Sequence, residues 1–186
     1  MTARTAEDGV EPWVVHRDGF DVVRVALDEA LFALSNGYIG LRGSLEEGEP
    51  RSVPGTYVNG FHEERPLPHP EAGYGFPESG QTMINVTDGK LIRVLVDDST
   101  LDLQYGTVRS HRRSLDLRNG VLDRRTEWTS PNGRSVRVRS QRLVSFTHRT
   151  LAAIRYEVEA LDDLHVTLQS DLLANEPTDG RTGDPR

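Results

Sequence analysis

The chain has 186 residues, no cysteine, 35% hydrophobic residues and a formal net charge of −7 at pH 7. The negative charge repels nucleic-acid phosphates, and the absence of cysteine excludes disulfides and thiolate metal sites. No run approaches the roughly 18 apolar residues of a membrane-spanning helix, and residues 1–9 lack the apolar centre of a signal peptide, so we expect a cytoplasmic protein and no membrane partner.

Short runs that alternate apolar and polar residues predict β-strands. Several are separated by Asp-Gly or Asn-Gly pairs, such as Asp18-Gly19, Asn119-Gly120 and Asn132-Gly133, which suit tight hairpin turns. The predicted strands cover residues 13–16, 20–25, 91–96, 101–103, 115–117, 121–128, 136–143, 151–158 and 164–168. Because a period of two buries one face and leaves the other wet, we predict an all-β, antiparallel β-sandwich.

Two segments do not follow the strand pattern. Residues 28–35 predict a helix of about two turns with Asp28 as its N-cap. Residues 47–79 hold six prolines and as many nearby glycines, which predicts a long, partly extended loop. We expect a disordered tail over residues 1–10, a sandwich domain over 11–176 and a loop over 177–186, where the chain is cut within its domain.

Adjacent carboxylates are the first candidates for acid–base chemistry, and the chain has three such pairs: Glu46-Glu47, Glu63-Glu64 and Asp97-Asp98. Neighbouring residues of a strand point to opposite faces, so such pairs seldom converge on one bond. We interpret all three as solvated surface charge and predict no catalytic residue in this chain.

Two polar clusters have structural interpretations. His62, Glu63, Glu64 and His69 match no recognised metal-ligand spacing, so we predict a flexible loop and no metal. The basic run 109–113 offers the one argument for a nucleic-acid-binding β domain. Between two predicted strands it more naturally marks a hairpin or an exposed sheet edge, and we predict no nucleic-acid partner.

Residues suited to sugar binding gather in two glycine-rich segments, and they are Asn36, Tyr38, Arg42, Tyr57 and Asn59. Amides and guanidinium groups pair with hydroxyls, while aromatic rings stack on the C–H face of a sugar. The alternative is that Asn36-Gly37 and Asn59-Gly60 are only turns, with Arg42 paired to a carboxylate such as Glu29. Both interpretations stay open.

These segments also carry a family resemblance. Residues 29–43 and 54–60, followed in order by 79–98, 114–124, 142–148 and 170–175, resemble the N-terminal domain of glycoside hydrolase family 65. That family includes maltose, trehalose and kojibiose phosphorylases and related α-glucoside hydrolases. One departure is the segment 85–89, Asn-Val-Thr-Asp-Gly, where many members carry an Asn-Pro-Asn-Trp-like sequence.

The resemblance implies a supersandwich similar to galactose mutarotase, placed before a catalytic helical barrel of the same polypeptide. It implies an inverting α-glucoside phosphorylase or hydrolase that needs no cofactor, with inorganic phosphate as co-substrate, an α-linked disaccharide as substrate, and a homodimer. The catalytic glutamate and the phosphate-binding residues would lie in the barrel. The alternative is a stand-alone carbohydrate-binding or mutarotase-like sandwich.

Overall fold

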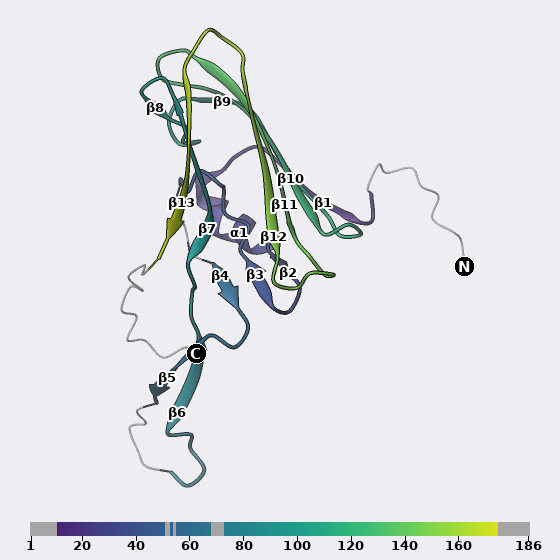
Figure 1. The fold of residues 1–186 in the computed structure, drawn as a ribbon, viewed down its shortest axis with the longest axis vertical. Coiled ribbons are helices and arrows are strands. Elements are labelled where there is room, and N and C mark those ends of the chain that lie inside the picture. Colours follow the sequence, from purple (N-terminus) through teal and green to yellow (C-terminus); the bar gives the residue numbers. More distant parts are fainter. Residues whose placement is uncertain (1–10, 51–52, 54, 68–72, 175–186) are drawn as a thin grey trace, which may run out of the picture.

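The computed structural model describes residues 11–50, 53, 55–67 and 73–174, and strands dominate it (Figure 1). The predicted tails at 1–10 and 177–186 lie outside the described residues. The helices are η1 (Val22–Arg24, a 3₁₀ turn) and α1 (Val25–Leu31). The strands are β1 (Val14–Asp18), β2 (Leu34–Ser35), β3 (Ile39–Leu41), β4 (Thr56–Val58), β5 (His62–Pro66), β6 (Ser79–Met83), β7 (Asp88–Val96), β8 (Ser99–Thr100), β9 (Thr107–Asp116), β10 (Val121–Thr129), β11 (Ser135–Val144), β12 (Ala152–Ala160) and β13 (Val166–Leu173).

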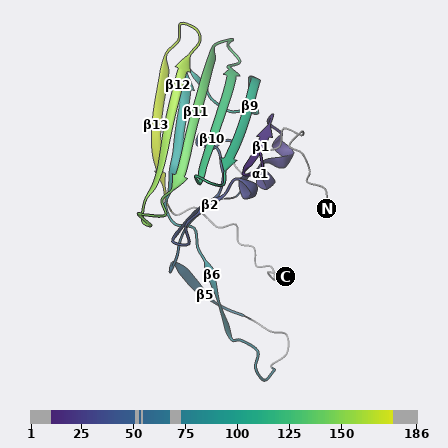
Figure 2. The ribbon, with the colours of Figure 1, turned by 90° about the vertical axis from the view of Figure 1, so that its right-hand side faces the viewer.

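The largest element is a five-stranded antiparallel sheet in the order β1-β9-β10-β11-β12, seen side by side in Figure 2. Its central strands are joined by the predicted Asn-Gly turns. Gly120 connects β9 to β10 with a φ of 64°, and Gly133 connects β10 to β11 with a φ of 81°. Positive φ explains why both turns use glycine.

Two smaller sheets cover one face of this large sheet. One has the order β13-β7-β8, and the other has the order β2-β3-β4. The apolar core follows this division. Val94 and Val96 of β7 pack with Trp128 of β10 near one end, while Phe32, after α1, packs with Leu115 of β9 near the other. The predicted antiparallel sandwich is therefore confirmed.

The inner face of the large sheet is polar in its middle. Cross-strand pairing places Arg113, Arg124, Ser140 and Tyr156 in one row, with His111 and Thr126 in the next. Apolar rows lie at both ends, as the two core clusters show. The predicted alternation was thus correct in period, but at these positions the inward residue is polar or charged instead of apolar.

The proline-rich segment differs from its prediction as one long loop. It contains β4 and β5, and β6 begins at its last residue and pairs with β5, with His62 opposite Met83 and Pro66 opposite Ser79. The β5–β6 pair projects away from the sandwich in both views (Figures 1 and 2). Proline is tolerated here because Pro66 is the last residue of β5, which is an edge strand of a two-stranded sheet among the described residues.

The helix lies earlier than predicted, and a predicted strand is absent. Residues 20–25 were predicted to form a strand after the Asp18-Gly19 turn, but they do not pair with β1, which pairs with β9 instead. Asp21 caps η1 by accepting a 3.0 Å hydrogen bond from the Val23 amide, and α1 continues to Leu31. Asp28 is therefore inside the helix. The local capping outweighed the strand propensity of the valines. Residues 101–103 also lie just after β8 rather than in a strand.

None of the helices in the described part of the chain has the length and apolar composition needed to cross a bilayer.

Candidate functional site

The sheet β2-β3-β4 gathers all five residues predicted for sugar binding. Asn36 and Tyr38 lie in the β2–β3 turn, and Arg42 directly follows β3. Tyr57 is in β4, opposite Gly40, and the backbone amide of Asn59 donates to the Tyr38 carbonyl at 2.8 Å. Residues far apart in two glycine-rich segments thus share one small sheet.

Asn36 uses its side chain to hold the turn. Its Oδ1 accepts from the amides of Tyr38 and Ile39, both at 2.9 Å. Its Nδ2 donates to the carbonyls of Ser145 and Arg149, at 2.6 Å and 3.0 Å. Both ends of the amide are engaged, so Asn36 connects this sheet to the loop after β11.

Arg42 turns toward α1. Its Nη2 lies 3.6 Å from Glu29 Oε2 and donates to the Ala26 carbonyl at 3.1 Å. The ion pair with Glu29 anticipated from the sequence is therefore present. The aliphatic part of Arg42 lies over Gly55, where an added Cβ would come within 2.1 Å of Arg42 Cγ. This contact explains the glycine at 55.

Tyr38, Tyr57 and Asn59 share the opposite face from Ile39 and Val58. Residues opposite one another in an antiparallel pair lie on one face, as do alternate residues of a strand. Both tyrosines are half-buried, and Asn59 is exposed. Gly40, opposite Tyr57, adds no side chain to this face. The arrangement offers aromatic surface beside an amide, which suits a sugar ring.

The segment that departs from the family pattern lies beside this sheet. Asn85 Oδ1 accepts from the Thr56 amide at 3.2 Å, and the Val86 amide donates to the Thr56 carbonyl at 2.8 Å. Lys90, the only lysine of the chain, is buried and donates to Thr56 Oγ1 at 2.5 Å and Asp88 Oδ1 at 2.7 Å. Burial lowers the pKa of Lys90, while Asp88 opposes that shift.

The interpretation of Glu46 and Glu47 as surface charge is wrong. Both side chains are buried, with 2% and 1% of their residue surface exposed. Glu46 Oε1 is 2.6 Å from Arg142 Nη2, and Arg124 donates to both oxygens of Glu47 at 2.8 Å and 2.5 Å. The two glutamates are neighbours in a segment that crosses the sheet's inner face, not in a strand, so the rule of opposite faces did not apply.

The charge cluster stays ionised. Burial alone would raise the pKa of Glu46, but Arg142 and Arg124 outweigh burial and lower it from 4.5 to about 2. Burial and the neighbouring Glu47 both raise the pKa of Tyr156, whose hydroxyl donates to Glu47 Oε1. A general acid needs a carboxyl that holds its proton near neutral pH. Glu46 has the opposite property, so its role is to pair with arginine.

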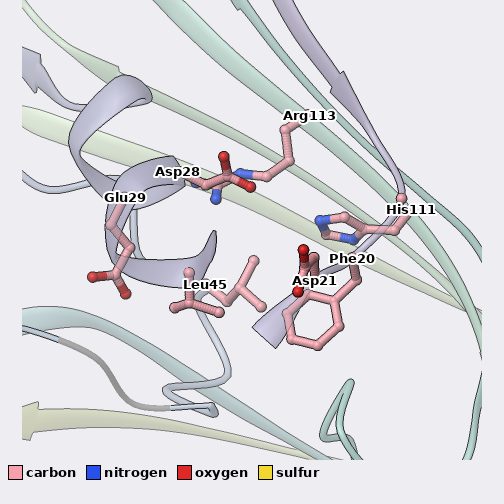
Figure 3. A pocket seen from close by; sticks show the side chains of 9 residues that line it. Phe20, Asp21, Asp28, Glu29, Leu45, His111 and Arg113 are labelled. Atoms are coloured by element: carbon pink, nitrogen blue, oxygen red, sulfur yellow. The ribbon is translucent and has the colours of Figure 1, made fainter. Parts of the chain in front are cut away.

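A small pocket opens beside α1, lined by Phe20, Asp28, Leu45, His111 and Arg113 among others (Figure 3). Its volume of about 20 Å³ accommodates one or two water molecules. Asp28 Oδ1 lies 3.4 Å from Arg17 Nε, and the buried Arg113 Nε has no hydrogen-bond partner among the residues that the structure describes. A sugar ring does not fit.

The structure also places parts of the two other polar clusters. His62, Glu63 and Glu64 lie on the projecting β5, and His69 lies outside the described residues. No group of three possible metal ligands occurs among residues whose placement is described. The basic run belongs to β9, where Arg112 and Arg113 pair with β1 and residues 107–111 continue past the end of that strand. The run therefore marks a strand and part of an edge, not a hairpin.

A signal for the buried cluster was present in the sequence. The inward positions of β9, β10 and β11 carry Arg113, Arg124 and Arg142 in otherwise apolar alternation. Buried arginines require carboxylate partners. A search for paired glutamates outside the strands would have given Glu46-Glu47 as the candidate partners.

Comparison with known proteins agrees with this architecture. The family model described as glycosyl hydrolase family 65, N-terminal domain, matches residues 15–186. An uncharacterized glycosyl hydrolase of Mycobacterium tuberculosis is 54% identical over 178 residues, which are 95% of this chain and 23% of that protein. The α,α-trehalose phosphorylase of Thermoanaerobacter brockii is 40% identical over 156 residues, 82% of this chain and 20% of that protein.

A solved structure shares the fold of this chain. A protein described as a putative kojibiose phosphorylase from the human microbiome superposes with a TM-score of 0.77 at 26% identity, covering 85% of this chain and 21% of that one. The chain spans about a fifth of the length of the relatives that it matches. It belongs to glycoside hydrolase family 65 and corresponds to that family's N-terminal domain.

Proposed function

We propose that this chain is the non-catalytic N-terminal sandwich of an inverting enzyme that cleaves an α-linked glucobiose. The preferred reaction is phosphorolysis, which yields β-glucose 1-phosphate and glucose. The observation that carries this proposal is the 40% identity to a trehalose phosphorylase over 82% of the chain. The 54% identical relative is named only as a glycosyl hydrolase, so hydrolysis is the competing reaction.

The two reactions differ in what attacks the anomeric carbon. In phosphorolysis one carboxylic acid protonates the glycosidic oxygen while a phosphate oxygen attacks C1 from the opposite face. The C1–O bond breaks, the proton leaves with the released glucose, and the configuration at C1 inverts. Hydrolysis replaces phosphate by water, which requires a second carboxylate as base.

The buried glutamates support a non-catalytic role for this domain. Glu46 and Glu47 are held by Arg142 and Arg124, and Glu29 lies beside Arg42. Each carboxylate is neutralised by a guanidinium group and enclosed by the sandwich, where no disaccharide reaches it. We therefore propose that the acid and the phosphate-binding residues belong to a helical barrel later in the same polypeptide.

The role proposed for the sandwich is to support that barrel and to frame its sugar pocket. The face of the β2-β3-β4 sheet that carries Tyr38, Tyr57 and Asn59 is the surface that fits the second task. Tyrosine rings supply a stacking surface, and the amide supplies a donor and an acceptor. Asn36 and Arg42 then hold this sheet in position, because both side chains are committed to neighbouring backbone and to Glu29.

The test uses the full-length protein with trehalose, maltose, nigerose and kojibiose, each with and without phosphate. Glucose and glucose 1-phosphate are measured separately, and the anomer of the phosphate ester is assigned by NMR. Phosphate-dependent release of the β-anomer is expected. Equal glucose release without phosphate would instead assign a hydrolase, and no reaction with any α-glucoside would contradict both. Light scattering of the same sample tests the proposed homodimer.

A further inference from the structure

The helical segment η1–α1 has its polarity reversed relative to an ordinary surface helix. The side of the segment that faces the sandwich carries Asp28 and the 3%-exposed Glu29, and both line the small pocket (Figure 3). The outward side carries Val22, Val23, Leu27 and Leu31, exposed by 51%, 87%, 57% and 41%. Surface helices normally bury the apolar stripe and expose the carboxylates.

The outward side forms a continuous apolar stripe. Leu27 and Leu31 lie four residues apart in α1, so they share one face of that helix, and the exposed Val22 and Val23 of η1 directly precede it. Ala26, Ala30 and Ala33 are also exposed, and Arg24 is the one exposed charge between Val22 and Ala33. We call Val22, Val23, Ala26, Leu27, Ala30 and Leu31 the helix stripe. Leaving such a stripe in water is costly, which indicates a covering partner.

We propose that the helix stripe is an intramolecular docking surface, covered in the full-length protein by the part of the same polypeptide that follows residue 186. The matched relatives are several times longer than this chain, and the chain corresponds to their N-terminal domain. Most of the polypeptide is thus available to cover the stripe. The covering surface requires apolar side chains and an acceptor oxygen opposite Arg24.

The size of the stripe favours this occupant over a second copy. The helix stripe has six residues, whereas a stable protein–protein interface takes about 20–30 residues from each partner. A stable dimer buries about 800 Å² per partner. A segment of the same chain needs far less area, because the covalent connection supplies a high effective concentration.

The composition disfavours a lipid surface. Helices that lie on membranes carry lysine and arginine along their polar face. The inward face here carries Asp28 and Glu29, and the whole chain has a net charge of −7. The proposal depends on the place of this domain in a longer polypeptide, but it does not depend on the reaction that the enzyme catalyses.

Thiol labelling of the full-length protein tests the docking. Residues 1–186 contain no cysteine, so Leu27→Cys and the control Leu117→Cys each introduce one identifiable thiol. Leu117, at the β9–β10 turn, is 51% exposed, close to the 57% of Leu27. Labelling by a maleimide, followed by peptide mass spectrometry, should be about tenfold slower at 27 than at 117 under native conditions and equal in urea. Equal native rates would overturn the proposal, and Ala30→Cys repeats the test with a smaller change if Leu27→Cys does not fold.

Photo-cross-linking identifies the occupant. Benzoylphenylalanine replaces Leu27 in the full-length protein. The protein is prepared once with ¹⁴N and once with ¹⁵N, and the two preparations are mixed before irradiation. Cross-links to peptides beyond residue 186 that carry one isotope only are expected. Mixed-isotope cross-links would assign the stripe to a second copy, and cross-links confined to residues 1–186 would show that nothing downstream covers it. Either result overturns the proposal, and neither depends on enzymatic activity.

Discussion

Arg124 and Glu47 form a two-pronged ion pair in the middle of the sandwich, where each is almost completely buried. Arg124 Nη1 donates to Glu47 Oε2 at 2.8 Å, and Nη2 donates to Oε1 at 2.5 Å. The Tyr156 hydroxyl donates to the same carboxylate, and Arg124 also lies 3.3 Å from Glu46. This pair fixes the segment after β3 across the inner face of the large sheet, and so connects the small sheet to the main core.

Breaking that pair should destabilise the protein strongly. Arg124→Met leaves Glu47 charged and buried without its main partner, and the loss of one member of a buried pair typically costs about 3–5 kcal/mol. We expect a large drop in the unfolding temperature of the full-length protein, measured by calorimetry. The double variant Arg124→Met/Glu47→Met should recover part of that loss, because it removes both charges.

Arg125→Met is the matched control for that experiment. Arg125 is the next residue on β10, points to the other face, and pairs with Asp123 at 3.2 Å while 65% of its side chain is exposed. Exposed ion pairs contribute less than about 1 kcal/mol. Equal effects of the two substitutions would contradict the importance assigned to the buried pair.

His111 should make the protein less stable as the pH falls below neutral. Burial, and then the charges of Arg124 and Arg113, lower the pKa of His111 from 6.5 to about 3. Between these values the unfolded chain binds a proton that the folded chain does not. The stability associated with neutral His111 is therefore complete above pH 6.5 and is lost toward pH 3, by up to about 1.4 kcal/mol per pH unit.

The measurement compares the free energy of unfolding at pH 7 and pH 5. His111→Asn, which retains a polar group near Thr126 Oγ1, should reduce the difference between the two pH values. His148→Asn removes an exposed histidine and serves as control. An unchanged pH dependence in His111→Asn would show that other groups control acid stability.

Much of the fold was predictable because its signals are local. Period-two alternation located β10, β11 and β12 to within a residue or two, and Asn119-Gly120 and Asn132-Gly133 located their turns. The structure brings Tyr57 and Asn59 beside Asn36 and Tyr38 in one small sheet. What remains a prediction is their contact with a sugar.

The failures have two causes, which are contacts between residues distant in sequence and a local cap that outweighs strand propensity. Glu47 is buried because Arg124, 77 residues away, receives it. The valines at 22 and 23 form a 3₁₀ turn because Asp21 caps it and because the amide of Gly19 donates to the His111 carbonyl, which directs the chain away from a hairpin. Local propensity contains neither kind of information.

Two glycines with the same backbone conformation should respond differently to alanine. Gly106 and Gly133 have φ values of 84° and 81°. A Cβ at Gly106 would lie 2.4 Å from the Thr129 carbonyl oxygen and 2.9 Å from Trp128 Nε1, whereas at Gly133 nothing lies within 4 Å. Gly133→Ala therefore has only the left-handed backbone cost, about 1–2 kcal/mol.

Gly106→Ala should cost clearly more than Gly133→Ala. The added methyl group must displace the turn whose Tyr105 carbonyl accepts the Trp128 indole hydrogen at 2.7 Å. Chemical unfolding gives the free-energy change for each substitution. Equal destabilisation by both substitutions would mean that the turn moves aside without resistance.

The small sheet provides the test of substrate framing. If its exposed face contributes to the sugar pocket, Tyr57→Phe and Asn59→Ala should each raise KM by about tenfold, the equivalent of one hydrogen bond of about 1.4 kcal/mol. The value of kcat should remain unchanged, because these contacts hold the bound substrate and the transition state equally. The unfolding temperature of Asn59→Ala should stay near that of the parent, because Asn59 is exposed.

Arg42→Ala should behave differently from those two variants. It removes the guanidinium group 3.6 Å from buried Glu29, and a buried group left without its partner costs about 1–3 kcal/mol. We expect a lower unfolding temperature. We expect KM to change only at temperatures where the variant begins to unfold. Steady-state kinetics and calorimetry on the same samples separate the effects. Unchanged kinetics in Tyr57→Phe and Asn59→Ala would contradict substrate framing. The five residues would then have a structural role only, which the lower stability of Arg42→Ala would report.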